Sequence, residues 1–334
     1  MPVNGRLYVR GLNWIGDAVL SVGALQGLKK VRPDIRIVVG APVATAPIYR
    51  LSASVEEVIA PPSLLSRERF DAAVVLPRSF RSAWESFSTS SVRIGYASEG
   101  RSLFLTRRLD YQHWKSAHRH QSGYYELLLT EIDPAVRFEA PRLQQSEKAL
   151  AEAARRMREL VPEGNRVMAI NPGAFYGRAK TWPTHHFVAL LNTLMETERT
   201  LHAILFSGQG DRPLAEEIVR RFPHPKVHSV AGELSLEQSA ALLSLCDFLV
   251  TNDSGMMHLG GALEKRGIAL FGPTDPVSTG PVSPPSGLGM EVLSVSTSCA
   301  PCLLRECPID HRCMEQLSPA LVSSRILTLL KEIS

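Results

Sequence analysis

The chain has 334 residues, a formal net charge of +4 and a hydrophobic fraction of 44%. This length allows two domains with separate cores, and the composition excludes a disordered or fibrous protein. No apolar run reaches the roughly 20 residues that span a bilayer. The N-terminal segment lacks a signal-peptide layout, because Asn13 and Asp17 interrupt its apolar stretch, so we expect a cytoplasmic protein.

Strands and helices alternate along the first half of the chain. Strands are predicted at Arg6–Arg10, Ile35–Val39 and Ala72–Leu76, and helices at Gly16–Lys30 and Ser82–Phe87. Residues 88–125 look irregular and basic. From Arg78 to His120, eight Lys or Arg residues stand against three acids. This run is either a solvated surface or a face for an anionic partner such as a lipid or saccharide, and no nucleic-acid-binding motif accompanies it.

A charged helix at Ser146–Leu160 leads to Val161–Gly164, which we interpret as an interdomain hinge. A second alternating set follows, with strands at Val167–Ile170, His202–Phe206, Phe248–Val250 and Ile268–Phe271, and helices at Phe187–Leu194, Leu214–Phe222, Leu236–Leu245, Met256–Leu263 and Ala320–Ile333. Two such sets predict two α/β domains with parallel sheets, and a ligand site between them.

The segment Thr251–Ala262 (TNDSGMMHLGGA) is the most informative one. An apolar strand ends there in a tight turn that opens a helix, whose first N–H groups and dipole favour phosphate. Asp253 can accept hydrogen bonds from hydroxyl groups, and His258 lies one turn further on. A ligand with both phosphates and hydroxyls, such as a nucleotide sugar, fits this pattern.

Two further turns follow strands in the second half. Gly173 allows a ligand to approach the backbone, and Arg178 and Lys180 can neutralise a diphosphate, although they would also suit a plain surface loop. Ser207–Asp211 is either part of the nucleotide site or an ordinary turn. Neither turn has the pattern of a P-loop.

Asp17 begins the first helix directly after the first strand, where ligands bind in open α/β sheets. It is either a functional carboxylate or an acid that only stabilises the helix N-terminus. The segment lacks G-x-G-x-x-G, so a dinucleotide site is not predicted.

Four cysteines, Cys299, Cys302, Cys307 and Cys313, form a C-x2-C-x4-C-x5-C pattern. They are either a structural metal site or free thiols, since disulfides are rare in the cytosol. The adjacent residues His185 and His186 are expected to point in different directions and not to share a metal.

Several segments together resemble the ADP-heptose:lipopolysaccharide heptosyltransferases of glycosyltransferase family 9, especially the heptosyltransferase II branch. They are Asn13–Asp17, Leu76–Ser82, Arg93–Tyr96, Asn171–Ala174, Lys180–Pro183, Asn252–Gly255 with His258, Phe271–Pro276 and the cysteine pattern. The resemblance implies an α/β fold of the GT-B type, with two Rossmann-like domains facing each other across a cleft. Residues 1–160 would bind the acceptor and carry the base, residues 161–318 would bind the ADP-sugar, and the helix at 319–334 would pack back on the N-terminal domain.

The resemblance also implies a reaction, the inverting, metal-independent transfer of L-glycero-D-manno-heptose from ADP-heptose to the inner core of lipopolysaccharide. No cofactor or nucleic acid takes part. The acceptor would be Kdo-lipid A or a heptosylated core, at the cytoplasmic face of the inner membrane. Asp17 would be the catalytic base. Donor-binding residues would be Gly173, Arg178, Lys180, Asp253, Ser254, Gly255 and His258, and acceptor-binding residues Asn13, Arg78 and Arg81.

Three alternatives stay open. The first is heptosyltransferase I or another family 9 transferase, although the histidine that the heptosyltransferase I branch often has after the base is missing from Val19–Val22. The second is an epimerase of the same architecture. The third is a protein that binds nucleotide sugar or lipid A without catalysis.

Overall fold

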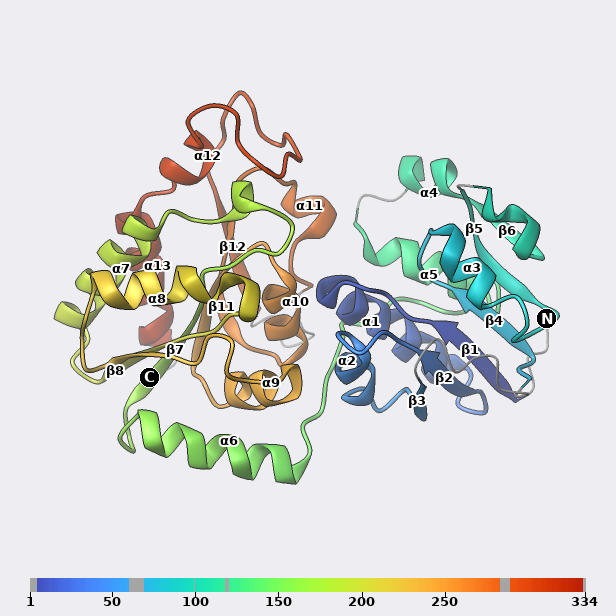
Figure 1. Cartoon of the computed structure of the whole chain (residues 1–334), viewed down its shortest axis with the longest axis horizontal. Coiled ribbons are helices and arrows are strands. Elements are labelled where there is room, and N and C mark those ends of the chain that lie inside the picture. Colours follow the sequence, from blue (N-terminus) through green and yellow to red (C-terminus); the bar gives the residue numbers. More distant parts are fainter. Residues whose placement is uncertain (1–4, 60–68, 99, 118–119, 283–288, 333–334) are drawn as a thin grey trace. The chain divides into compact units, whose positions relative to one another are not determined.

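The computed structural model describes residues 5–59, 69–98, 100–117, 120–282 and 289–332. The chain divides into two compact units, residues 1–144 and 145–334. Each unit contains one six-stranded sheet covered by helices (Figure 1). Every strand pair in both sheets is parallel. Because parallel strands need covered faces, the central strands of both sheets are largely buried apolar runs, whereas the edge strands are partly exposed.

The sheet of the first unit has the order β3-β2-β1-β4-β5-β6. Its strands are β1 (Arg6–Arg10), β2 (Arg36–Gly40), β3 (Glu57–Ile59), β4 (Ala72–Val75), β5 (Arg93–Ala97) and β6 (Arg107–Asp110). Its helices are α1 (Ile15–Val31), α2 (Ala46–Arg50), α3 (Phe80–Glu85), α4 (Tyr111–Ala117) and α5 (Ser122–Thr130), with a 3₁₀ turn η2 (Arg101–Phe104). The strand order reverses between β1 and β4, so α1 and α3 begin beside the switch point, where ligands bind in such sheets.

The sheet of the second unit repeats this plan with the order β12-β11-β10-β7-β8-β9. Its strands are β7 (Arg166–Asn171), β8 (Leu201–Leu205), β9 (Val227–Ser229), β10 (Phe248–Asn252), β11 (Arg266–Phe271) and β12 (Met290–Ser294). Its helices are α6 (Glu147–Leu160), α7 (Thr184–Thr197), α8 (Arg212–Arg221), α9 (Leu236–Ser244), α10 (Gly255–Ala262), α11 (Pro276–Thr279), α12 (Arg312–Glu315) and α13 (Pro319–Glu332), and its 3₁₀ turns are η3 (Arg178–Lys180) and η4 (Gln209–Asp211). The switch point lies between β7 and β10, where Thr251 pairs with Asn171.

The domain boundary differs from the expected one at residue 160. Helix α6 belongs to the second unit, where it packs on α9 and Arg156 forms a 2.9 Å ion pair with Glu233. The expected hinge at Val161–Gly164 therefore lies inside the second unit, between α6 and β7. The helix had no apolar partner visible in sequence, so its charged surface looked like that of a linker.

The terminal helix packs within the second unit. In α13, the buried residues Val322, Ile326 and Leu330 join the apolar core of the second unit, and the helix packs on α7 and β11. Its apolar face is therefore covered within its own unit, and the expectation that the helix packs back on the N-terminal domain stays a prediction. The predicted end of this helix at Ile333 lies outside the described residues.

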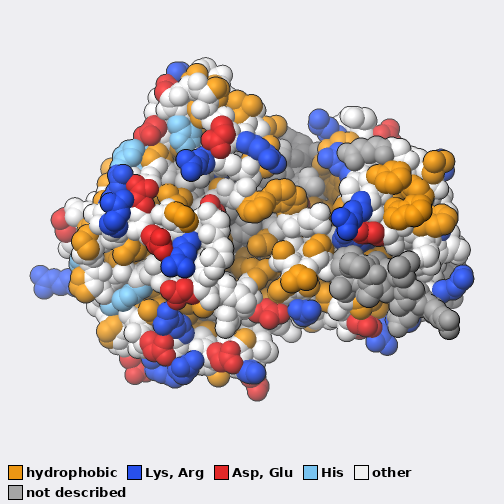
Figure 2. All heavy atoms as spheres, viewed as in Figure 1, with side chains coloured by type: hydrophobic (Ala, Val, Ile, Leu, Met, Phe, Trp, Pro, Cys, Tyr) orange, Lys and Arg blue, Asp and Glu red, His pale blue; other side chains and the backbone are white. Residues whose placement is uncertain are grey.

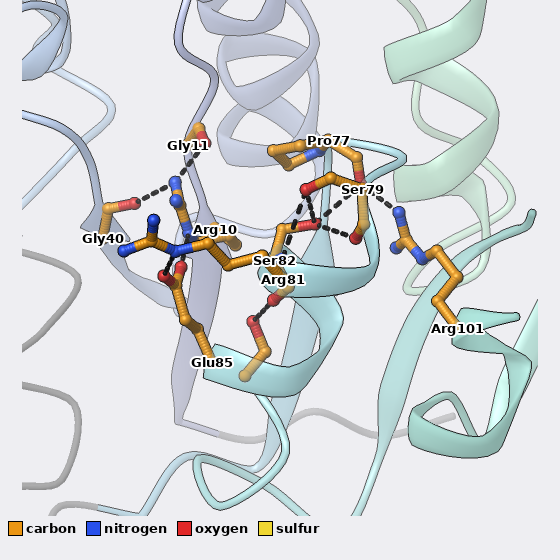
Figure 3. A network of polar contacts seen from close by, with 10 residues as sticks. Arg10, Gly11, Gly40, Pro77, Ser79, Arg81, Ser82, Glu85 and Arg101 are labelled. Atoms are coloured by element: carbon orange, nitrogen blue, oxygen red, sulfur yellow. Dashed lines mark hydrogen bonds and ion pairs between the residues drawn. The ribbon is translucent and has the colours of Figure 1, made fainter. Parts of the chain in front are cut away.

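The segment expected to be irregular, residues 88–125, contains β5, β6, α4 and the start of α5. The arginines of this segment interrupt the apolar runs from which strands are predicted. In β6, partly buried and exposed residues alternate and the exposed ones are charged, so no continuous apolar run marks the strand. Arg101 is fully buried, and its guanidinium hydrogen-bonds the carbonyl oxygen of Val75 and that of Pro77. Figure 3 shows the contact with Pro77.

Candidate functional site

Two asparagines hold together the turns that follow β7 and β10. Asn171 donates through Nδ2 to the carbonyl oxygen of Gly173 (3.1 Å) and to Oγ of Ser254 (3.0 Å). Asn252 accepts a 3.1 Å hydrogen bond from the backbone N–H of Trp182. Both asparagines are buried. The predicted donor residues of the two turns are thus brought to one place at the switch point of the second sheet.

Lys180 and Asp253 form an ion pair there. The distance between Lys180 Nζ and Asp253 Oδ2 is 2.6 Å, and the side chains are 13% and 6% exposed. Thr274, in the turn after β11, donates a 2.6 Å hydrogen bond to the same carboxylate oxygen. The lysine also lies over the ring of Tyr176. The turns after β7, β10 and β11 therefore all contribute to fixing the ammonium group.

The helix that follows this carboxylate starts without a side-chain cap. Ser254 is the N-cap residue of α10, yet its side chain makes no capping hydrogen bond, because it is engaged with Asn171. The N–H groups at the start of an uncapped helix are suited to bind an anion. Gly255 is the first helical residue, and His258, one turn later, is buried. The binding of phosphate at this end of α10 stays a prediction.

The turn at Ser207–Asp211, left open by the sequence, reaches the same place. A Cβ atom on Gly173 would overlap the carboxylate of Asp211, so a larger residue here would displace the Asp211 side chain. Burial raises the pKa of the Asp211 carboxyl. Arg178, in contrast, has an exposed side chain at the edge of the site.

The cysteine-rich loop has a role that sequence reasoning missed. It hydrogen-bonds both sides of Ala179, the residue between Arg178 and Lys180. The N–H of Ala179 donates to the carbonyl of Arg305 (2.9 Å), and its carbonyl oxygen lies 2.8 Å from Nε2 of His311. The loop thus clamps the turn that carries the lysine. The histidine inside the cysteine pattern was the signal available in the sequence.

The four cysteines differ in exposure. Cys299 and Cys302 are exposed and Cys313 is buried. Within the described residues, the one group of three or more His, Cys, Asp or Glu side chains whose ligand atoms lie within 4.8 Å of one another is that of His185, His186 and Glu315. Burial raises the pKa of the Cys313 thiol, and the charges of Cys299, Cys302 and Cys307 raise it further, so the four thiols lie near one another, and the choice between a metal site and free thiols stays open.

The two histidines differ from the expectation that they point apart. Their ring centroids are 4.4 Å apart, and their Nε2 atoms lie 3.4 Å (His185) and 3.8 Å (His186) from Oε2 of Glu315. The first turn of α7 lets both rings lean toward α12, which a residue-spacing argument on one helix could not foresee. The described residues thus include one three-ligand group that is able to hold a metal ion.

In the first unit, Asp17 lies in the first turn of α1 and is partly exposed. The hydroxyl of Tyr125, on α5, donates a 2.9 Å hydrogen bond to Asp17 Oδ1. Burial raises the pKa of Tyr125 well above its ordinary value, and the charge of Asp17 raises it further, so the hydroxyl stays a donor. Asp17 is therefore an oriented carboxylate rather than only a helix-terminal acid.

The turn before α1 is held by buried hydroxyl groups. The backbone N–H of Leu12 donates to the hydroxyl of Tyr49 (3.1 Å), and Thr45 donates to the carbonyl of Leu12 (2.6 Å). Burial raises the pKa of Tyr49 to about 12. The next residue, Asn13, is exposed. These bonds fix the backbone that places Asn13 and Asp17.

An arginine pair shares one carboxylate on α3 (Figure 3). Glu85 accepts from the buried Arg10 (3.0 Å) and from Arg81 (2.7 Å), whose side chain is 82% exposed. Arg78, also exposed, stacks its guanidinium 3.9 Å from the ring centroid of Tyr111. The predicted acceptor residues Asn13, Arg78 and Arg81 are thus all accessible on the first unit.

The family model of glycosyltransferase family 9 (heptosyltransferase) matches residues 63–312, more than half of the chain. The chain belongs to this family. It is 30% identical over 304 residues to lipooligosaccharide heptosyltransferase 2 of Haemophilus ducreyi, covering 83% of this chain and 86% of the relative. It is also 30% identical over 303 residues to lipopolysaccharide heptosyltransferase 2 of Escherichia coli K12, with the same coverage.

Solved structures of family 9 members agree with this assignment. ADP-heptose lipopolysaccharide heptosyltransferase II of E. coli matches with a TM-score of 0.82 and 26% identity, covering 98% of this chain and 100% of that one. The family 9 glycosyltransferase of Veillonella parvula matches with a TM-score of 0.83 at 18% identity, covering 99% of each chain. The predicted α/β fold of the GT-B type, with two Rossmann-like domains, is confirmed.

The branch prediction is supported by the extent of the matches. The family 9 relative named lipopolysaccharide heptosyltransferase 1, from E. coli K12, is 32% identical over only 98 residues, which is 29% of this chain. None of the helices in the described parts of the chain has the length and apolar character needed to span a bilayer.

Proposed function

We propose that the protein transfers L-glycero-D-manno-heptose from ADP-heptose to the inner core of lipopolysaccharide, with addition of the second heptose as its step. The relatives named heptosyltransferase 2 match most of the chain. The observation that carries the proposal is the buried Lys180–Asp253 pair beside the uncapped start of α10. This arrangement offers one ligand the positive charge of Lys180, a carboxylate of Asp253 that accepts hydrogen bonds from hydroxyl groups, and the backbone N–H donors at the start of α10. An ADP-sugar requires all three.

The second unit, residues 145–334, holds the donor in this proposal. Lys180 and the N–H groups at Ser254 and Gly255 stabilise the diphosphate, and Arg178 adds charge at the exposed edge. Gly173 contributes its backbone to the donor site, since the space beside its Cα atom is filled by the Asp211 carboxylate. Asp253 accepts hydrogen bonds from hydroxyl groups, and His258 helps to hold the phosphates or the heptose.

The first unit, residues 1–144, supplies the base and binds the acceptor. Asp17 removes the proton of the acceptor hydroxyl, whose oxygen forms a bond to the anomeric carbon of heptose. The bond from that carbon to the ADP oxygen breaks, and the electron pair leaves with ADP. The anomeric configuration inverts. Lys180 and the backbone donors stabilise the charge that develops on the leaving diphosphate, so the transfer needs neither metal nor cofactor.

Asn13, Arg78 and Arg81 bind the acceptor, which is Kdo-lipid A or a heptosylated core. Its phosphates and the Kdo carboxylates are anionic, and guanidinium groups bind such oxygens in pairs. Because the acceptor is anchored in a membrane by lipid A, the protein acts at the cytoplasmic face of the inner membrane as a peripheral protein.

Two experiments separate this proposal from the alternatives. With ADP-heptose alone, a transferase leaves the configuration of the donor unchanged, whereas an epimerase isomerises it without an acceptor. Replacement of Asp17 by Asn in a transferase keeps donor affinity and removes turnover. A binding protein keeps both donor affinity and cellular phenotype in that variant. Isomerisation of the donor without an acceptor, or an unchanged phenotype of Asp17→Asn, would refute the proposal.

A further inference from the structure

The first unit exposes a cluster of large apolar side chains on α3 and η2. We call Phe80, Trp84, Phe87, Leu103 and Phe104 the aromatic patch. Phe80 is 48%, Trp84 61%, Phe87 48% and Leu103 81% exposed. Figure 2 shows hydrophobic side chains gathered on the surface over α3. Contiguous apolar surface of this kind marks an interaction site, whereas isolated exposed apolar residues are ordinary.

The rings of the aromatic patch are held in place by contacts with one another. The ring of Phe104 makes edge-to-face contacts with Phe80 (5.1 Å), Trp84 (5.3 Å) and Phe87 (5.7 Å between centroids). These contacts hold three rings side by side without burying them. A preformed group of rings loses little conformational freedom when it binds.

Positive charge borders the aromatic patch. Arg93 lies with its guanidinium 4.8 Å from the ring centroid of Phe87, and Arg81 stands on the same helix as the rings, 82% exposed. Glu85, the acid of α3, is already shared by Arg10 and Arg81 and adds no free negative charge. In the described part of residues 78–117, six Lys or Arg residues that are at least partly exposed stand against the two acids Glu85 and Asp110, whereas Arg101 is fully buried. Glu99 and Arg119 lie outside the described residues.

We propose that the aromatic patch docks the first unit on a bilayer that contains anionic lipid. Trp and Phe side chains enter the boundary between headgroups and acyl chains, and the bordering arginines contact lipid phosphates. A second copy of the chain fits less well, because a symmetric contact would place the arginines of both copies together. The relevance to a lipid-anchored acceptor rests on the proposed function, but the docking itself does not.

Vesicle flotation tests the docking directly. Wild type is expected to float with phosphatidylglycerol-containing vesicles and much less with pure phosphatidylcholine vesicles, and salt should weaken the binding. The double variant Trp84→Ala/Phe87→Ala should bind at least about tenfold more weakly, because most of the inserted apolar surface is lost. Leu321→Ala, at a 41% exposed apolar residue on α13, serves as the matched control and should bind as wild type does.

Tryptophan quenching locates the contact. Lipids with brominated acyl chains should quench the fluorescence of wild type, and Trp84→Phe should remove most of that quenching while vesicle binding persists. Trp14→Phe, at the other exposed tryptophan of the first unit, should leave the quenching in place. Quenching that survives Trp84→Phe, or unweakened flotation of the double variant, would overturn the inference. The inference would also be overturned if wild type failed to bind vesicles but formed a concentration-dependent dimer that the double variant abolishes.

Activity measurements keep this inference separate from the proposed function. The double variant should transfer heptose normally to a deacylated, water-soluble acceptor and poorly to the same core embedded in vesicles. Vesicle binding without any heptose transfer would refute the proposed function and leave the docking proposal intact. Equal transfer to both acceptors by wild type and by the double variant would refute the docking proposal and leave the proposed function intact.

Discussion

Lys180 and Asp253 make a 2.6 Å ion pair that joins the turn after β7 to the turn after β10, with both side chains largely withdrawn from solvent. The removal of one partner from a buried pair leaves the other charge uncompensated. The aspartate therefore does more than accept hydroxyl hydrogen bonds, because it also holds the ammonium group where the diphosphate of a donor would bind.

Lys180→Ala should raise the KM for ADP-heptose and lower kcat, for a combined loss of kcat/KM of about 10- to 1000-fold, because both bound and leaving diphosphate lose their counter-charge. Steady-state kinetics at saturating acceptor measure this. Arg220→Ala, at an exposed arginine of α8, is the matched control and should behave as wild type. Equal kinetics for Lys180→Ala and Arg220→Ala would show that Lys180 is not part of the donor site.

Asp17→Asn should lower kcat by about 10²- to 10⁴-fold with little change in donor binding, since the general base is lost and the donor residues are intact. Single-turnover kinetics together with donor titration by calorimetry measure the two quantities. A loss confined to donor binding would show that Asp17 does not act as the base.

Tyr125→Phe tests whether the hydroxyl of Tyr125 positions that base. We expect a smaller loss, about tenfold, and a shift of the acidic limb of the kcat/KM profile toward higher pH, because the carboxylate loses a donor that favours its charged form. Tyr96→Phe is the control, since the hydroxyl of Tyr96 bonds the carbonyl of Tyr124 instead of Asp17. A lower rate with an unmoved pH profile would indicate a structural role only.

The sequence predicted the alternation of strands and helices and most of the donor turns, because apolar runs ending in glycine-containing turns are local signals. Tyr125 was not predicted, since its contact with Asp17 spans 108 residues and depends on how α5 packs on α1. The assignment of α6 to the first domain failed for the same reason, because the sequence does not show which helix an apolar face packs on. The clamp on Ala179 was missed because it binds the backbone N–H and carbonyl of Ala179, which leave no residue-type pattern; the side chain of His311 was its only signal in the sequence.

His311→Ala should weaken donor binding about 3- to 10-fold, because one of the two hydrogen bonds that clamp Ala179 is lost and the turn carrying Lys180 gains freedom. Donor titration and protease nicking of residues 174–182 measure this. His113→Ala, at an exposed histidine of α4, should change neither. Wild-type affinity and nicking in His311→Ala would show that the clamp does not order the site.

Transfer should survive removal of metal ions. Protein purified without chelator should contain no stoichiometric metal that depends on the four cysteines, because no three of their sulfur atoms lie within 4.8 Å of one another, and EDTA should leave kcat unchanged. Elemental analysis of wild type, of Cys299→Ser/Cys302→Ser and of His186→Gln measures this. Metal that disappears with the cysteine variant would contradict this expectation, and metal that disappears with His186→Gln would place an ion at the His185, His186 and Glu315 group.

The central claim is tested most directly by one transfer assay with ADP-heptose and two acceptors, Kdo-lipid A without heptose and the same acceptor carrying one heptose, with products identified by mass and by NMR of the new linkage. The account predicts transfer of one heptose to the monoheptosylated acceptor, with inversion at the anomeric carbon and with loss of transfer in Asp17→Asn. Transfer only to the acceptor without heptose, or retention of configuration, would contradict it.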